Sequence, residues 1–123
     1  MIKLFEQKKG EEIIKVNYVD DNNLFAGFDM ECSCCEDPQH YIEDANGNRV
    51  EVNLGYNYLE FTGELPEEDD CNMFDTCTAR IPLRDRNTGE TYHLVFSNCH
   101  NGWYSHEYEF GKMNIEIKKE GHI

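Results

Sequence analysis

The class of fold is decided by residues 13–30, which read IIKVNYVDDNNLFAGFDM. In the first half, Ile14, Val16 and Tyr18 alternate with polar side chains, and this period of two is the pattern of a half-buried β-strand. The Asp and Asn cluster at residues 20–23 is typical of a turn, because these side chains bond to nearby backbone amides. Apolar residues then occupy every second position after the turn. The stretch therefore predicts an antiparallel hairpin.

Short strand patterns separated by turn signals continue along the rest of the chain. We expect strands at residues 40–44, 50–54, 56–62, 76–83, 91–98, 103–110 and 113–118, and an N-terminal arm or short strand within residues 1–12. Pro38 is expected to break any strand that reaches it, and the polar stretch 64–72 is expected to be a solvated loop. No stretch of ten residues has the period of an amphipathic helix. The prediction is therefore an all-β, single-domain antiparallel sandwich or small barrel of about eight short strands.

A chain of 123 residues is expected to form one domain, residues 1–123, with a hydrophobic core large enough to be stable without disulfides or a structural metal. The first ten residues contain no apolar run of signal-peptide length, and no segment resembles a transmembrane helix. A cytoplasmic location follows as the default. In that reducing compartment the six cysteines are expected to be thiols or metal ligands, whereas secretion by another route would favour three disulfides.

Negative charge is concentrated in the middle of the chain. The formal net charge is −14, and residues 20–75 contain sixteen Asp and Glu against a single base, Arg49. This balance disfavours bare nucleic acid and anionic membranes as partners, because contacts to phosphate need Lys and Arg. A cation or a basic protein surface fits the charge better. The alternative is that the acidic residues only keep a small protein soluble.

A dense group of cysteines lies directly after the predicted hairpin, at residues 32–35. Cys32 and Cys35 have the C-x-x-C spacing, and Cys99-His100 follows in a later turn. Two ligands from each of two loops could form a tetrahedral zinc site. The pattern is weaker than a pair of C-x-x-C motifs, because adjacent residues of an extended strand point to opposite sides. Buried thiols without a metal, and disulfides, are the alternatives.

Two polar stretches are candidates for contacting a partner. The first is an acidic run of four residues, Glu67, Glu68, Asp69 and Asp70, for which a plain solvated loop is the alternative. The second is residues 97–106, in which three side chains combine amide and aromatic groups, namely Asn101, Trp103 and Tyr104. Such groups suit a binding surface. Core packing of the aromatic rings beside an Asn-Gly turn is the alternative.

Catalysis is not expected from this chain. A redox cysteine needs a helix N-terminus to lower its pKa, but Cys32 is followed by acidic residues and Pro38. The flanking carboxylates should raise thiol pKa values. Cys99 and His100 could form a nucleophile–base pair, yet no strand–elbow–helix context surrounds them.

Four short motifs resemble a group of small uncharacterised proteins encoded by phages, prophages and bacteria. The motifs are the hairpin at residues 13–29, Cys-Cys-Glu at 34–36, Tyr-Ile-Glu-Asp at 41–44 and Asn-Gly-Trp-Tyr-Ser at 101–105. Members of that group carry a Cys-Cys-Glu element and a late Ser-Asn-Gly-Tyr-Tyr element in the same order, and the likeness covers residues 13–110. This chain departs at His100, at Trp103 in place of Tyr, and at the added Cys32. The resemblance implies a phage or bacterial setting and supplies no catalytic residue.

Together, the charge and the resemblance predict a non-enzymatic acidic binding protein of phage or bacterial origin. Its expected partner is a basic protein surface, and one form of this function is inhibition of a basic or nucleic-acid-binding host protein. The alternative is a small zinc-binding structural domain that uses the cysteine cluster.

Overall fold

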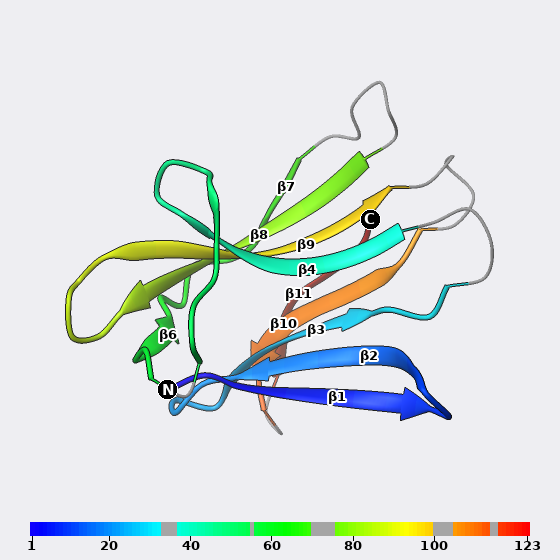
Figure 1. Cartoon of the computed structure of the whole chain (residues 1–123), viewed down its shortest axis with the longest axis horizontal. Coiled ribbons are helices and arrows are strands. Elements are labelled where there is room, and N and C mark those ends of the chain that lie inside the picture. Colours follow the sequence, from blue (N-terminus) through cyan, green and yellow to red (C-terminus); the bar gives the residue numbers. More distant parts are fainter. Residues whose placement is uncertain (33–36, 55, 70–75, 100–104, 114–115) are drawn as a thin grey trace.

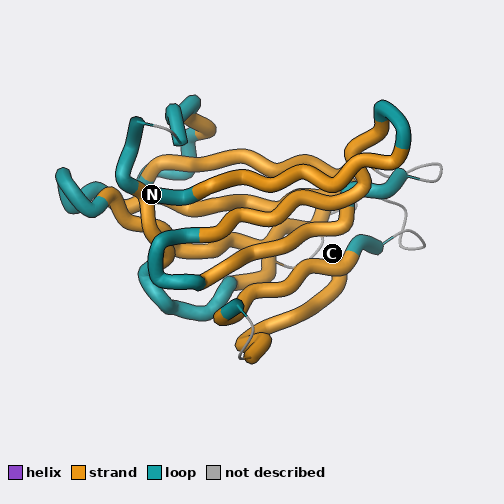
Figure 2. The backbone as a smooth tube through the Cα atoms, turned by 90° about the horizontal axis from the view of Figure 1, so that it is seen from below, coloured by secondary structure: helices purple, strands orange, loops and turns teal. Residues whose placement is uncertain are grey.

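Two antiparallel β-sheets face each other across a shared hydrophobic core (Figures 1 and 2). The computed structural model describes residues 1–32, 37–54, 56–69, 76–99, 105–113 and 116–123, with residues 116–118 described in their backbone only. Sheet A has the order β1 (Lys3–Lys9), β2 (Glu12–Val19), β3 (Leu24–Asp29), β10 (Glu107–Lys112), β11 (Glu116–His122). Sheet B has the order β5 (Arg49–Val50), β4 (Asp37–Asp44), β9 (Thr91–Cys99), β8 (Thr76–Asp85), β6 (Leu59–Phe61), and β7 (Glu67–Asp69) also pairs with β8. The predicted all-β sandwich is confirmed, with eleven short strands in the described part of the chain.

The hairpin predicted at residues 13–30 is confirmed as β2 and β3. Val16 pairs with Phe28, and Tyr18 pairs with Ala26. All four side chains are buried, because they lie on the face of sheet A that is turned toward sheet B. The period of two in the sequence therefore reports the core-facing side of both strands.

Aromatic side chains from the two sheets meet in the centre of the core. Phe28 of β3 stacks on Phe96 of β9, with ring centroids 4.8 Å apart and 10° between the ring planes. Phe61 of β6 meets Phe110 of β10 edge-on at 5.5 Å. These separations are the ones at which aromatic rings attract each other. Because each pair takes one ring from each sheet, the two contacts hold the layers face to face.

Asp20 connects the β2–β3 turn to the opposite sheet. Its Oδ1 accepts hydrogen bonds from the backbone N–H groups of Asn22 and Leu24, both at 2.9 Å. Its Oδ2 accepts one from the backbone N–H of Phe61 in β6, at 3.1 Å. The side chain is only 5% exposed, and these three bonds offset the cost of burying a carboxylate. One turn residue thus positions β6 beside sheet A.

A polar contact also bridges the two sheets, between the hydroxyl of Tyr18 on β2 and Nδ1 of His40 on β4. Burial, with the charge of Glu6 adding to it, raises the pKa of Tyr18, so the hydroxyl keeps its proton and can donate it to a neutral imidazole. Burial is also the main cause that lowers the pKa of His40; Glu6 opposes it and Arg49 assists it. Both shifts favour the same uncharged hydrogen-bonded pair.

Two local expectations were wrong. Pro38 lies inside β4 and pairs with Asn98. It is tolerated because β5 reaches only Ile42 and Glu43, so the other side of β4 is a sheet edge near Pro38 among the described residues, where a missing amide donor breaks no ladder. The acidic stretch expected to be a solvated loop contains β7, which pairs with β8.

The sequence pattern also overestimated the length of some strands. Of residues 50–54, only Val50 belongs to a strand, although Val52 and Leu54 still pack against the core as partly buried side chains. Of the strand expected at residues 103–110, residues 105 and 106 are not in a strand, β10 begins at Glu107, and residues 103 and 104 lie outside the described part of the chain. Apolar side chains can thus alternate into the core without forming a hydrogen-bonded ladder.

Replacing Phe96 with Ala should lower the free energy of unfolding by about 3–5 kcal/mol, because the substitution removes one ring of the central stack and leaves a cavity. Phe5→Ala is the matched control: Phe5 is 54% exposed, so its loss should change the free energy by less than about 0.5 kcal/mol. Urea unfolding of both variants measures the two effects. Equal effects would contradict the assignment of Phe96 to the core.

Acidification should destabilise the protein through His40. Because the folded-state pKa of His40 is lowered, its neutral form stabilises the fold fully above the unfolded-state pKa near 6.5, and this contribution is lost as the pH falls through the folded-state value. Between pH 7 and 5.5, the free energy of unfolding should therefore fall more steeply for the natural chain than for His40→Gln, by at most about 1.4 kcal/mol per pH unit. Equal slopes in urea unfolding series would refute this role.

Candidate functional site

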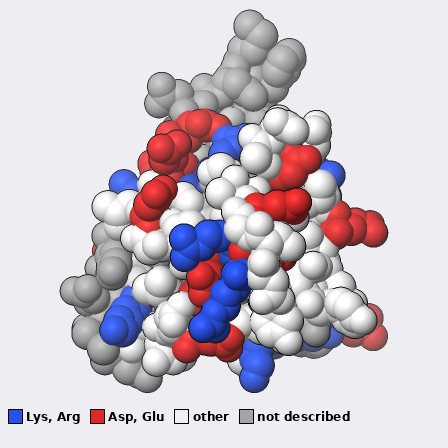
Figure 3. Space-filling view, turned by 90° about the vertical axis from the view of Figure 1, so that its left-hand side faces the viewer, with Lys and Arg blue, Asp and Glu red and all other residues white. Residues whose placement is uncertain are grey.

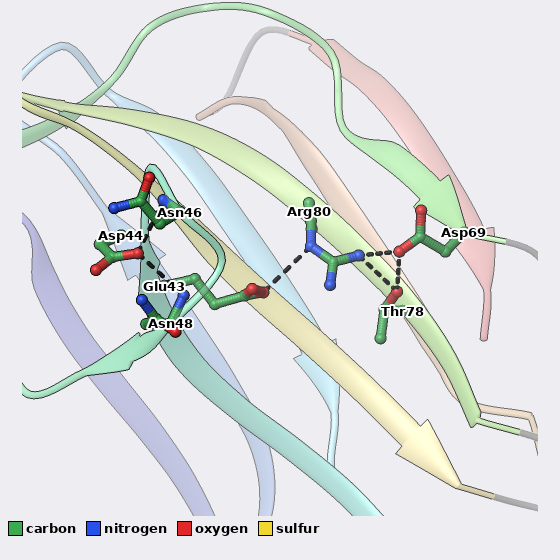
Figure 4. Close-up of polar contacts among 7 residues, drawn as sticks. All are labelled: Glu43, Asp44, Asn46, Asn48, Asp69, Thr78 and Arg80. Carbon is green, nitrogen blue, oxygen red and sulfur yellow. Dashed lines mark hydrogen bonds and ion pairs between the residues drawn. The ribbon is translucent and has the colours of Figure 1, made fainter.

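Half of the acidic run predicted to face a partner makes contacts within the molecule. Asp69 of β7 accepts a hydrogen bond from Oγ1 of Thr78 at 2.8 Å and forms an ion pair with Nη1 of Arg80 (Figure 4). Thr78 and Arg80 belong to β8, next to β7 in the sheet. These contacts explain why an acidic stretch forms a strand: the guanidinium of Arg80 compensates the charge of Asp69, and the hydroxyl of Thr78 donates a hydrogen bond to it.

Arg80 also holds a buried carboxylate on the outer face of sheet B. Its Nε donates to Oε1 of Glu43 at 3.1 Å, and Glu43 is only 4% exposed (Figure 4). A carboxylate removed from water needs a partner charge of this kind. One guanidinium therefore connects β4, β8 and β7, across the intervening β9, where Val95 is completely buried. We assign a structural role, and not a binding role, to this network.

Glu68, the central residue of β7, makes a contact between the sheets. The hydroxyl of Tyr108 on β10 donates a hydrogen bond to Oε1 of Glu68. Burial raises the pKa of Tyr108, and the hydrogen bond to Glu68 adds to the shift, so the phenol stays protonated and remains a donor. Of the predicted acidic run, Glu67 is exposed and makes no ion pair with another described residue, and Asp70 lies outside the described residues.

The predicted zinc ligands are only partly described. Cys32 follows β3 and is exposed, with its Sγ 3.6 Å from the carbonyl oxygen of Met30. Cys99 is exposed at the end of β9, where its register partners are Asp37 and Thr76. Cys35 and His100 lie outside the described residues. Within the described ranges no three His, Cys, Asp or Glu side chains are arranged to hold a metal, and the zinc site stays a prediction.

Cys77 corrects one expectation about the cysteines. It is buried in the core at 3% exposure and is disulfide-bonded, whereas the sequence analysis favoured thiols or metal ligands. That expectation rested on the inferred location in the reducing cytoplasm, because the spacing of cysteines in a sequence does not by itself show which of them form disulfides.

The aromatic and amide candidates Asn101, Trp103 and Tyr104 lie outside the described residues. His106, which follows this stretch in the sequence and is described, is 2% exposed. Its Nδ1 lies 2.6 Å from the backbone oxygen of Asp29 and 3.7 Å from Oδ2 of the same residue. A group so deeply buried cannot reach a substrate in solution. Its position directly before β10, in contact with the end of β3, makes it a structural support for Asp29.

The feature that the sequence analysis missed is the face of sheet A that points away from sheet B. It carries an apolar hollow of about 500 Å³, lined by Phe5, Asn17, Val19, Phe25 and Met113. Beside it lies an acidic hollow of about 250 Å³, lined by Lys15, Gly27, Asp29, Glu107, Tyr108 and Glu109. A signal for the apolar hollow was present: Val19 and Phe25 are apolar at positions where the alternation demands polar side chains.

Comparison of the chain with protein-family models, with curated proteins and with solved structures finds no match. The resemblance to phage, prophage and bacterial proteins therefore stays a prediction.

Because Cys77 is disulfide-bonded, at most four of the six cysteines should react as thiols in protein purified without reductant. Titration with Ellman's reagent, in denaturant with EDTA, counts the thiols whether or not they are buried or metal-bound in the folded chain. Reduction beforehand should raise the count to six. A count of six without reduction would show that Cys77 is a thiol.

Proposed function

We propose that this chain is a non-enzymatic acidic binding protein whose partner is a basic protein surface. The observation that carries the proposal is a surplus of carboxylates on the surface that the chain's own bases do not compensate. Among the described residues only three carboxylates are buried, those of Asp20, Glu43 and Asp85. The remaining described Asp and Glu side chains lie at the surface and outnumber the bases there.

Several bases are already engaged within the molecule. Arg80 pairs with Glu43 and Asp69, Lys15 with Glu109 at 3.5 Å, and Arg84 with Glu60 at 3.0 Å. At the end of the sandwich seen in Figure 3, basic and acidic side chains lie next to one another. These bases are thus neutralised by carboxylates of the same chain, and the excess surface charge that a partner would meet is negative.

An excess of exposed carboxylates attracts cationic surfaces over the range of the Debye length and repels phosphate groups. This favours a protein partner rich in Lys and Arg over nucleic acid or an anionic membrane. None of the described segments is a helix of the length and apolarity that crossing a membrane requires. The negative charge therefore attracts the proposed basic partner and also discriminates against nucleic acid and anionic membranes.

We propose that the partner belongs to a bacterial host, as the resemblance noted from the sequence implies. A host protein that binds nucleic acid presents a basic surface, and an acidic protein that covers this surface would act as an inhibitor. The proposed location is the cytoplasm, and the disulfide at Cys77 is the observation that speaks against it, since disulfides are uncommon there.

Zinc binding through Cys32, Cys35, Cys99 and His100 remains the alternative function. Elemental analysis of the purified protein decides that question, since a structural site would hold near-stoichiometric zinc.

Salt should weaken the interaction with a partner steeply. When the immobilised chain is incubated with bacterial lysate, we expect the retained protein to be basic and to dissociate between about 0.1 and 1 M NaCl, because the Debye length shrinks from about 10 to 3 Å over that range. A chain of the same length and neutral net charge serves as the control surface. Retention of an acidic protein, retention unchanged by salt, or no retained protein would each count against the proposal.

A further inference from the structure

Alternation along the strands of sheet A fixes which residues face away from the core. Val16, Ala26 and Phe28 are completely buried against sheet B. Their neighbours Lys15, Asn17 and Phe25 must therefore point to the opposite side. The apolar and acidic hollows both lie on this outer face of sheet A, and of their lining residues only Tyr108 belongs to the hydrophobic core.

The apolar hollow is an exception to the usual chemistry of such a face. When one side of an antiparallel sheet packs on a core, the other side normally carries polar residues. Here Phe5 of β1 is 54% exposed and Met113, directly after β10, is 39% exposed, while Val19 and Phe25 are partly buried between them. Large apolar side chains gathered at the surface around a hollow are a feature of interaction sites.

The acidic hollow adjoins the apolar one and is charged. Asp29, Glu107 and Glu109 contribute three carboxylates, against the single ammonium of Lys15, which pairs with Glu109 at 3.5 Å. The side chain of Lys15 is 40% exposed, so water screens the pair and a second cation can approach the remaining carboxylates. The hollow thus carries a net negative charge that an incoming Lys or Arg would neutralise.

The two hollows meet at one register pair, Asn17 of β2 and Gly27 of β3. A Cβ atom on Gly27 would lie 2.5 Å from Oδ1 of Asn17, closer than such atoms approach, and 3.5 Å from Glu109. The missing side chain therefore lets Asn17 lie flat across Gly27. No large side chain stands between the apolar and the acidic hollow at this pair.

We infer that the outer face of sheet A docks an extended basic segment of the partner protein, with an apolar side chain in the apolar hollow and a Lys or Arg in the acidic hollow. This inference rests on the proposed function and adds to it the binding face and the pattern of the ligand. Side chains on one face of an extended segment repeat every ~6.6–6.8 Å, so the two anchors should lie two or four residues apart. A second copy of this chain is disfavoured as the occupant, because it also carries a net charge of −14 and would be repelled by the acidic hollow.

Selection from a display library of random dodecapeptides against the immobilised full-length chain tests the inference. The enriched peptides should contain an apolar residue and a Lys or Arg two or four positions apart. Phe5→Ser should weaken binding of the enriched peptide at least about fivefold, and so should the double variant Glu107→Gln/Glu109→Gln, as expected for central contacts.

The controls remove the same kinds of side chain from another part of the molecule. Leu65→Ser removes an apolar side chain of similar exposure, 52%, from a segment beside sheet B. Glu51→Gln/Glu64→Gln removes two exposed carboxylates near sheet B. Both should change affinity less than about twofold, the scale of contacts outside an interface.

The outcomes separate the two proposals. If the enriched peptides are basic but bind Phe5→Ser and Glu107→Gln/Glu109→Gln as tightly as the natural chain, the binding face is wrong and the acidic binding function stands. If the enriched peptides lack Lys and Arg, or if none is enriched, both proposals fail. Peptides that are basic and lose affinity only with the outer-face variants support the inference.

Discussion

The stack of Phe28 on Phe96 is the contact on which the other features of the sandwich depend. It sets which side of β3 and β9 turns inward, and because side chains alternate along a strand it sets the outward side as well. With Phe28 inside, Gly27 and Asp29 are placed on the outer face of sheet A. A shift of β3 by one residue would put Asp29 into the core and remove both hollows at once. The core contact and the proposed binding face are consequences of a single register.

A large negative charge is compatible with this fold because the buried carboxylates are paired or hydrogen-bonded. Asp20 accepts three backbone hydrogen bonds, and Glu43 meets Arg80. Glu68 and Asp69 also make specific contacts, so half of the acidic run that looked like a recognition loop stabilises the sandwich instead. The carboxylates around Lys15 are different. They lie on an open face, and one ammonium does not balance them.

The sequence predicted the features that depend on local pattern. Alternation of Val16 and Tyr18, followed by a turn of Asp and Asn, gave the central hairpin and the all-β class correctly, because period and turn chemistry are encoded within a few residues. Pro38 and β7 were misjudged because each depends on its neighbour in space: an open edge beside Pro38, and Thr78 and Arg80 beside Asp69. The outer-face hollows combine residues from β1, β2, β3 and β10, and no local pattern brings these together.

Binding of a basic segment to the outer face of sheet A can be followed through the amide signals of the glycines. Gly27 lies in the middle of that face, whereas Gly63 and Gly89 lie in turns at sheet B. In a titration of the ¹⁵N-labelled full-length chain with a selected basic peptide, followed by two-dimensional NMR, we expect the amide signals of Gly27 and Asn17 to shift progressively and those of Gly63 and Gly89 to stay in place. Shifts confined to Gly63, Gly89 and other signals of sheet B would contradict it.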